Sequence, residues 1–514
     1  MAALEDHDPD PGLSNDDIRP TTPSERRWSV ANMASLWIGM VVSVPTYTLA
    51  ASLINEGMSW WQAVMTIMLG NVIVLVPMVL NGHAGTKYGV PFPVLARASF
   101  GIKGAHIPSL LRALVACGWF GIQTWFGGFA IYQLANALLG DALVGSDLPL
   151  LGINAGELSC FVVFWLLQLW VIDRGVESIR LMETLAAPFL VGIGLLLLGW
   201  AYTAAGGFDA MLHDQGQFGP GGARQGQFLS VFVPSLTAMV GFWATLSLNI
   251  PDFTRYARTQ RDQVLGQALG LPTTMTLFAF ISVAVTSATT VIFADPVTGV
   301  PAEPIWDPTI LAGRIGGGFT VVLSLLALAV ATLSTNIAAN VVSPVNAMIN
   351  AAPDRITFRI GGFITAGLGF AIFPWKILAT TGDYIFTWLV GYSALLGPVG
   401  GILIADYFVL RKTELDLTGL YRRQGPYAYG RGFNPAALVA FAVAVAPCVP
   451  GFLHQAGAIG DGVLPPWLDE IYTYAWFFGF AVAGALYLVL MRVLSPDSGP
   501  ATTSTPTPSN KESP

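Results

Sequence analysis

Charge is what this chain has least of. Lys, Arg, Asp and Glu make up 11% of its 514 residues, whereas hydrophobic residues make up 54%. Ordinary soluble domains carry about 25% charged residues. A chain with so little charge cannot present a polar surface to water over most of its length, so it is predicted to lie in a membrane. Its apolar runs do not alternate with period two, which leaves an all-α polytopic membrane protein rather than a membrane barrel.

Reactive and metal-binding side chains are also scarce. The three cysteines all lie in apolar runs and are predicted to be core residues, not a disulfide or metal framework. The five histidines are scattered and form no acidic cluster at bilayer depth, which argues against an intramembrane enzyme. No Gly-rich loop followed by Lys-Ser/Thr occurs, which disfavours ATP-driven transport. No catalytic residue and no cofactor is expected.

Long apolar runs are abundant. Each is long enough to cross about 30 Å of hydrocarbon as a helix. We predict about 12 transmembrane helices, near residues 31–54, 61–82, 106–136, 157–172, 182–204, 229–250, 266–293, 317–349, 356–375, 380–409, 434–454 and 472–493.

Lys and Arg orient these spans. With the first thirty residues inside, 21 of the 24 basic residues fall in cytoplasmic segments or inner span ends, and the exceptions are Arg224, Arg314 and Lys376. This bias is the one that the positive-inside rule expects. We therefore predict a multi-pass protein of the cell (plasma) membrane with both termini in the cytoplasm.

Two spans carry helix-breaking residues at similar depth. Pro45 interrupts the first span and Gly241 the sixth. A kink without function is the simpler explanation for either one alone. Because the sixth span starts a second set of five, the two sets must have opposite orientation, and interrupted helices in matching places of inverted repeats mark the central site of a transporter.

This arrangement predicts the domain organisation. The acidic, Pro-containing N-terminus lacks the features of a cleavable signal, and the C-terminal tail is rich in Ser, Thr and Pro. We expect a disordered cytoplasmic arm at 1–28, a first five-helix repeat at 29–204, an inverted second repeat at 229–409, a cytoplasmic loop at 410–433, two accessory helices at 434–493 and a disordered tail at 494–514.

Polar side chains inside the spans suggest what the site holds. Trp119 and Gln123 lie four residues apart, so an aromatic plane and an amide share one helix face and can grip a flat, hydrogen-bonding ring. The alternative is an interfacial Trp and an amide that joins two helices. In span eight, Ser334 and Thr335 offer hydroxyl oxygens suited to a small cation, although such hydroxyls often bond to their own helix. Asn336 and Asn340 share another face of that span.

Five motifs resemble those of the nucleobase-cation symporters, which carry nucleobases, hydantoins and allantoin. The resemblance covers roughly residues 25 to 450. It rests on Asn81-Gly-His-Ala-Gly-Thr-Lys-Tyr-Gly89, Pro91-Phe-Pro-Val-Leu-Ala-Arg-Ala-Ser-Phe-Gly101, Trp119-Phe-Gly-Ile-Gln-Thr-Trp125, Asn249-Ile-Pro-Asp-Phe-Thr-Arg255 and Ser334-Thr-Asn-Ile-Ala-Ala-Asn340. It implies the ten-helix (LeuT-like) inverted-repeat fold of sodium-coupled amino-acid transporters plus two C-terminal helices.

The resemblance also implies roles for individual residues. Trp119 and Trp243 would be aromatic walls around a planar substrate, and Gln123 and Asn340 would hydrogen-bond its amide-like edge. Some relatives differ at Ser43 and Phe242, so these residues would line the pocket differently here. The implied Na⁺ site consists of backbone oxygen at Gly39 and Val42, carbonyl oxygen at Ala331, and the hydroxyls of Ser334 and Thr335.

Together these features predict a secondary active symporter that imports a planar heterocycle with Na⁺ by alternating access. Uracil, allantoin, hydantoin, cytosine and purines all fit the pattern. Alternatives are a proton-coupled permease, in which Asp252 or His83 would titrate, and a substrate sensor that does not transport. A channel is disfavoured because the spans carry no continuous file of charge. No nucleic acid polymer is expected as a partner.

Overall fold

The computed structural model describes residues 9–174, 176–213, 216–315, 318–378 and 387–494. Over this part of the chain the structure is helical and contains only isolated β-bridges. In the N-terminal half the helices are α1 (Val30–Val41), α2 (Val44–Asn55), α3 (Trp60–Tyr88), α4 (Phe92–Phe100), α5 (His106–Leu139), α6 (Ala155–Arg174), α7 (Val176–Ala205), α8 (Phe208–Met211), α9 (Phe228–Asn249) and α10 (Pro251–Thr254).

The second half begins with a long helix and ends with the C-terminal hairpin. Its helices are α11 (Gln260–Ile292), α12 (Pro308–Arg314), α13 (Gly318–Asn340), α14 (Val342–Ala351), α15 (Phe358–Ala371), α16 (Pro374–Ile377), α17 (Val390–Ile404), the π-helix η2 (Ala405–Leu410), the 3-10 turn η3 (Gly419–Tyr421), α18 (Pro435–Val445), α19 (Cys448–Gln455), α20 (Pro466–Thr473) and α21 (Ala475–Leu494).

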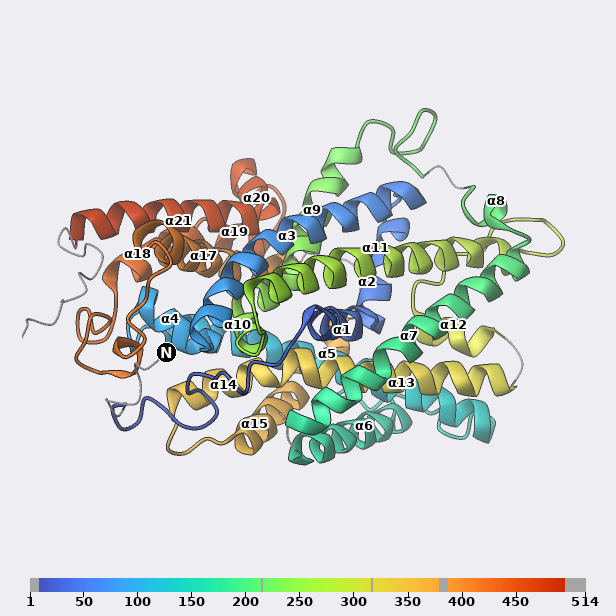
Figure 1. Cartoon of the computed structure of the whole chain (residues 1–514). Helices are drawn as coiled ribbons and strands as arrows, with labels where there is room; N and C mark the ends of the chain where they lie inside the picture. Colours follow the sequence, from blue (N-terminus) through green and yellow to red (C-terminus); the bar gives the residue numbers. More distant parts are fainter. Residues whose placement is uncertain (1–8, 175, 214–215, 316–317, 379–386, 495–514) are drawn as a thin grey trace, which may run out of the picture.

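Many of the helices have the length and composition of membrane spans. Within the described residues, eight qualify, and ten qualify when the bent pairs α1–α2 and α18–α19 each count as one span. Two shorter apolar helices, Val191–Ala205 and Phe358–Ala371, lie in two further predicted runs. Figure 1 shows α18 and α21 along one edge of the bundle, α6 and α15 along the opposite edge, and α1 and α5 between them.

The first span is broken, as predicted, but not at the proline. Helix α1 ends at Val41 and α2 begins at Val44, and the two axes differ by 60°. Pro45 lies in the first turn of α2, where a missing N–H removes no helix hydrogen bond. The break is made by the extended backbone of Ser43 (φ −144°, ψ 161°), and it leaves the last carbonyls of α1 without helix donors.

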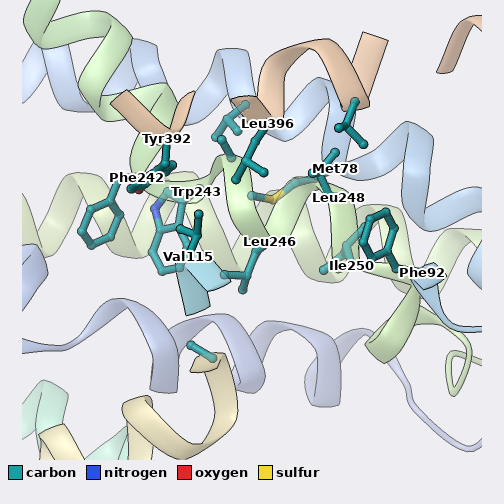
Figure 2. Packing of buried hydrophobic residues seen from close by; sticks show 14 of the residues in the cluster. Met78, Phe92, Val115, Phe242, Trp243, Leu246, Leu248, Ile250, Tyr392 and Leu396 are labelled. Atoms are coloured by element: carbon teal, nitrogen blue, oxygen red, sulfur yellow. The ribbon is translucent and has the colours of Figure 1, made fainter. Parts of the chain in front are cut away.

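The sixth span is not broken, and the expectation of an interruption at Gly241 was wrong. Helix α9 is continuous from Phe228 to Asn249. Gly241 serves close packing instead, because a Cβ there would collide with the Ser393 side chain and lie 3.1 Å from the Leu389 carbonyl oxygen. The glycine is compatible with a continuous helix, and its missing side chain leaves room for the residues of the neighbouring segment that contact it. Figure 2 shows the outcome, with Phe242 and Trp243 of α9 next to Tyr392 of α17.

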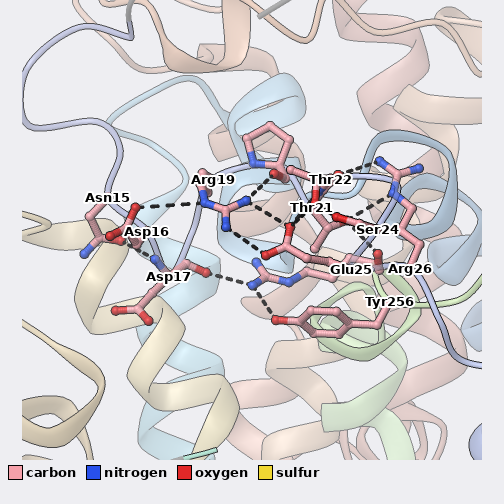
Figure 3. Close-up of polar contacts among 12 residues, drawn as sticks. Asn15, Asp16, Asp17, Arg19, Thr21, Thr22, Ser24, Glu25, Arg26 and Tyr256 are labelled. Carbon is pink, nitrogen blue, oxygen red and sulfur yellow. Dashed lines mark hydrogen bonds and ion pairs between the residues drawn. The ribbon is translucent and has the colours of Figure 1, made fainter.

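The N-terminal segment is packed over residues 9–28 rather than disordered. Ile18 is fully buried, and the Leu13 carbonyl accepts a hydrogen bond from the buried guanidinium of Arg97 at 2.9 Å. The Thr21 hydroxyl donates to the Arg255 carbonyl at 2.7 Å. Figure 3 shows Arg19 paired with Glu25 within the segment. Its composition suggested disorder because the partners that order it lie far away in sequence. Residues 1–8 and 495–514 lie outside the described residues.

The predicted loop at 410–433 is held against the helices by a buried acid that sequence analysis did not single out. Asp406, 1% exposed, accepts hydrogen bonds from Arg411 at 2.7 Å, Tyr487 at 2.7 Å and Ser99 at 3.0 Å. These partners come from the loop, α21 and α4. Asp406 therefore links the C-terminal helix α21 to α4 and to the loop at 410–433.

The close approach at Gly241 can be tested. Gly241→Ala should destabilise the protein by about 1 to 3 kcal/mol, because the new methyl group overpacks the contact between α9 and α17. The matched control is Gly199→Ala on α7, where a Cβ meets nothing within 4 Å. The apparent melting temperature of purified protein should fall for Gly241→Ala and not for Gly199→Ala. Equal melting temperatures would contradict the packing role.

Candidate functional site

A central cavity collects the residues that sequence analysis proposed for the substrate. Its lining includes Ser43 from the break after α1, Trp119 and Gln123 from α5, Phe242 and Trp243 from α9, and Asn340 from α13. All six predicted substrate residues therefore surround one space. Met40, Thr245, Leu246, Thr335 and Ala339 complete the lining.

Aromatic rings close this space. Phe242 packs edge to face between the two tryptophans, 5.3 Å from Trp119 and 5.0 Å from Trp243 between ring centroids. Trp37 of α1 meets Trp243 edge-on at 5.3 Å. The remaining volume is about 20 Å³, room for about one water molecule. A planar ring can enter only if these side chains and the helices that carry them move apart.

Two polar atoms of the lining are buried without a hydrogen-bond partner. They are Oε1 of Gln123, an acceptor if assigned as the amide oxygen, and Nε1 of Trp243, a donor. Leaving such groups unpaired costs about 1 to 3 kcal/mol each. A bound heterocycle with both N–H and C=O groups could pair both atoms, so the site is chemically complementary to a lactam or ureide edge.

The proposed cation ligands lie on two facing elements, the end of α1 and the middle of α13. The Thr335 hydroxyl donates to the Gly39 carbonyl oxygen across this interface at 3.0 Å. Val42 and Ala331 pack together in one small buried cluster, and Ser334 is fully buried. Neutral hydroxyl and carbonyl oxygens are hard ligands of the kind a small cation prefers. Because Thr335 also lines the central cavity, the two regions share an edge.

Arg112 is a polar residue near the cavity to which the sequence analysis gave no role in the site. It was counted among the basic residues of the inner span ends, and it is 1% exposed. Its Nε donates to Asn249 of α9 at 2.9 Å, and its Nη2 donates to the Ala339 carbonyl of α13 at 3.3 Å. Arg112 therefore ties α5 to two helices that line the cavity. The signal available in sequence was an arginine inside an apolar run, which is rare without a partner.

Asp252 and His83 stand apart from the cavity lining. The Asp252 carboxylate accepts from the Phe92 backbone N–H at 2.9 Å, just beyond the span that ends at Asn249. Burial is the main cause that raises the pKa of Asp252 to about 6. His83 belongs to α3, and its Nδ1 lies 3.0 Å from the hydroxyl oxygen of Tyr407 in η2. Neither residue lines the central cavity.

A polytopic helical bundle with a broken first span, and with a small polar-aromatic cavity between its first, third, sixth and eighth spans, has the architecture of a membrane transporter. Similarity to known proteins identifies the family of this chain. Residues 20–479 match the model of the permeases for cytosine/purines, uracil, thiamine and allantoin. The chain belongs to this family, the nucleobase-cation symporters.

Named relatives support the assignment. The purine-uracil permease NCS1 of Arabidopsis thaliana is 48% identical over 94% of this chain and 79% of the relative. The allantoin permease of Bacillus subtilis is 41% identical over 95% of this chain and 94% of the relative. Among solved structures, Mhp1, a nucleobase-cation-symport-1 family transporter with bromovinylhydantoin bound in a closed conformation, is similar with a TM-score of 0.73 and 26% identity. That match covers 94% of this chain and 96% of Mhp1.

The aromatic walls generate a binding prediction. Trp119→Ala and Trp243→Ala should each remove stacking of about 1 to 3 kcal/mol and weaken binding of a planar ring such as uracil about tenfold or more. The matched control is Trp125→Ala on the same helix as Trp119, since Trp125 stacks on Phe129 and does not line the cavity. Isothermal titration of the purified variants measures the effect. Unchanged affinity in both wall variants would refute the proposed pocket.

Proposed function

We propose that this transporter is a symporter that imports a planar nucleobase or a related cyclic ureide or hydantoin together with Na⁺. Uracil, allantoin, hydantoin, cytosine and purines are the candidate substrates. The observation that carries the proposal is the gathering of Ser43, Trp119, Gln123, Phe242, Trp243 and Asn340 around one cavity beside a broken span. The names of the relatives, which mention uracil, purine and allantoin, support the substrate class.

In this proposal the ring lies between Trp119 and Trp243. Phe242 has to leave its place between the two indoles, since it contacts both in the closed cavity. Gln123 and Asn340 then hydrogen-bond the polar edge of the ring, and Trp243 Nε1 can donate to a ring carbonyl. Stacking tolerates any flat heterocycle, so the polar groups decide which ring is preferred.

Sodium would be held between α1 and α13. Its ligands would be the carbonyl oxygens of Gly39, Val42 and Ala331 and the hydroxyls of Ser334 and Thr335. In the structure the Thr335 hydroxyl donates to the Gly39 carbonyl oxygen, with 3.0 Å between the two oxygens. When the ion binds, the hydroxyl hydrogen would turn away so that both oxygens face the ion. None of the side chains that line the central cavity ionises near neutral pH, which favours a metal cation over a proton.

The positions of the proposed cation ligands suggest how cation binding is coupled to substrate binding. Gly39 and Val42 belong to the broken first span, and Ser334 and Thr335 belong to α13 on the opposite side of the interface. A cation that bridges the two elements favours one relative position of the helices and so prepares the adjacent substrate cavity. Alternating access then exposes both sites first to one side of the membrane and then to the other.

Two other functions remain as alternatives. Proton coupling is favoured by one observation, the buried Asp252 carboxyl, whose pKa is raised to about 6 mainly by burial. A sensor that binds the ring without transporting it would keep the same cavity. Counterflow of labelled uracil in proteoliposomes separates transport from sensing.

The sodium assignment makes a linkage prediction. Sodium should tighten uracil binding, and uracil should tighten sodium binding by the same factor, at fixed pH and ionic strength with choline as the replacement cation. Thr335→Ala should reduce this mutual effect more than it reduces uracil affinity at saturating sodium. The matched control is Thr332→Ala on the same helix, whose hydroxyl donates to its own helix at Leu328.

The result against sodium is equally concrete. Uptake that follows an imposed pH gradient, ignores sodium and is unchanged in Thr335→Ala would move the coupling role to Asp252. In that case Asp252→Asn should abolish the response to pH. Sodium-dependent uptake that survives Asp252→Asn supports the sodium site.

A further inference from the structure

A layer of buried amides lies directly behind the substrate cavity. Asn340, which lines the cavity, donates from Nδ2 to Oδ1 of Asn336 at 3.0 Å. Asn336 in turn donates from Nδ2 to Oε1 of Gln168 at 2.6 Å. Gln168 donates from Nε2 to the Thr124 hydroxyl at 2.8 Å. Asn336, Gln168 and Thr124 are each 0% exposed, so these bonds form away from solvent.

The chain of hydrogen bonds has a fixed direction because it starts at a backbone carbonyl. The Phe120 carbonyl oxygen only accepts, and the Thr124 hydroxyl donates to it at 2.6 Å. Since its hydrogen is used there, the Thr124 oxygen must accept from Gln168, which therefore turns its own oxygen toward Asn336. The Thr124 hydroxyl thus orients the Gln168 amide, and Gln168 in turn orients the Asn336 amide.

A second, shorter route reaches the same result. Asn336 Nδ2 also donates to the Phe120 carbonyl oxygen at 3.0 Å. One end of the Asn336 amide faces two acceptor oxygens, Phe120 O and Gln168 Oε1. That end must therefore be the NH₂ group, since two oxygens cannot hydrogen-bond to each other without a hydrogen. The oxygen of Asn336 must then face Asn340, and it requires an N–H from Asn340. Both routes start at the Phe120 carbonyl oxygen and assign the same orientation to the Asn336 amide, in the way that hydrogen-bond networks determine amide orientation in general.

The consequence falls on Asn340. One N–H of its NH₂ group donates to Asn336, which holds the nitrogen end of the amide toward Asn336 and leaves the carbonyl oxygen as the end that faces away from it, toward the ring. We propose that Asn336 and Gln168 are positioning residues that hold Asn340 with its oxygen toward the substrate, so that the site selects a ring that presents an N–H at this edge. This inference rests on the proposed function, because it assumes that the ring binds in the central cavity.

The inference separates the candidate substrates by chemistry. Uracil and hydantoin carry imide N–H groups flanked by two carbonyls, so they can donate to Asn340 and accept from Trp243 Nε1. Cytosine is almost the same size, but its N3 carries no hydrogen. In the orientation that brings the imide N–H of uracil to Asn340, N3 of cytosine would face the Asn340 oxygen lone pair against lone pair, so cytosine has to turn and donate from another edge. Sites built from buried hydrogen-bonding groups discriminate strongly against such mismatches. The predicted class is therefore imides and cyclic ureides.

The test compares binding of uracil, hydantoin and cytosine by isothermal titration at saturating sodium. Wild-type protein should bind an imide at least about tenfold more tightly than cytosine. Asn336→Leu should lower this ratio toward one, because Asn340 then loses its partner and can rotate. Gln168→Leu should lower the ratio by less, because Asn336 loses one acceptor and still donates to the Phe120 carbonyl oxygen. Gln168→Glu, whose protonated acid retains an acceptor for Asn336 and a donor for Thr124, should preserve the ratio.

A control isolates the loss of a buried amide from the loss of direction. Asn71 of α3 is 0% exposed and bonds to the Ile67 carbonyl of its own helix at 2.7 Å, away from the cavity. Asn71→Leu should leave the ratio between imide and cytosine unchanged. If Asn336→Leu fails to fold, the ratio in Gln168→Leu decides the question, because Gln168 is two hydrogen bonds away from Asn340 and does not touch the ring.

The outcomes distinguish this inference from the function it rests on. Preference of the wild type for cytosine, or an unchanged ratio in Asn336→Leu and Gln168→Leu while Trp119→Ala still loses binding, overturns the positioning role and leaves the pocket intact. Absence of binding for all three rings, and for allantoin and purines in the same assay, overturns the proposed function itself, and the inference with it.

Discussion

A helix that breaks inside a membrane exposes carbonyl oxygens that lipid cannot satisfy. In this protein the break at Val42 and Ser43 creates that demand, and the hydroxyl of Thr335 on the facing helix meets part of it by bonding to Gly39. The same break places Ser43 in the lining of the central cavity, which Thr335 also lines. One local departure from helical geometry therefore produces the oxygen-rich interface and one wall of the pocket together.

Two buried arginines outside the cavity lining donate hydrogen bonds to neutral partners. Arg112 bonds to an asparagine and a backbone carbonyl, and Arg97 bonds to Asn350 and to the carbonyls of Leu13 and Leu420. Amides differ from charges in having a donor end and an acceptor end, so a chain of them carries direction as well as attraction. The series from Phe120 to Asn340 transmits such a direction to the edge of the cavity without placing an ionised group there.

Prediction from the sequence succeeded where the information is local. The spacing of Trp119 and Gln123 places both on one face of a helix, and both line the cavity. It failed where a distant neighbour decides. Glycine is a residue type that breaks helices, so Gly241 was expected to interrupt the span. In the structure it lies in a continuous helix and allows close contact with Leu389 and Ser393. The acidic segment at 9–28 has the composition of a disordered arm, yet buried arginines from elsewhere in the chain hold it.

The sequence by itself determined the membrane class, the approximate spans and the residue types of the site, because hydropathy and helical periodicity are properties of short segments. The resemblance to the symporters supplied the candidate roles. Only the tertiary structure decided that the break lies at Ser43, that Phe242 closes the cavity between two tryptophans, and that Gln168 orients Asn336. These three facts depend on contacts between helices that are distant in the chain, and no local pattern specifies which side chains meet across such an interface.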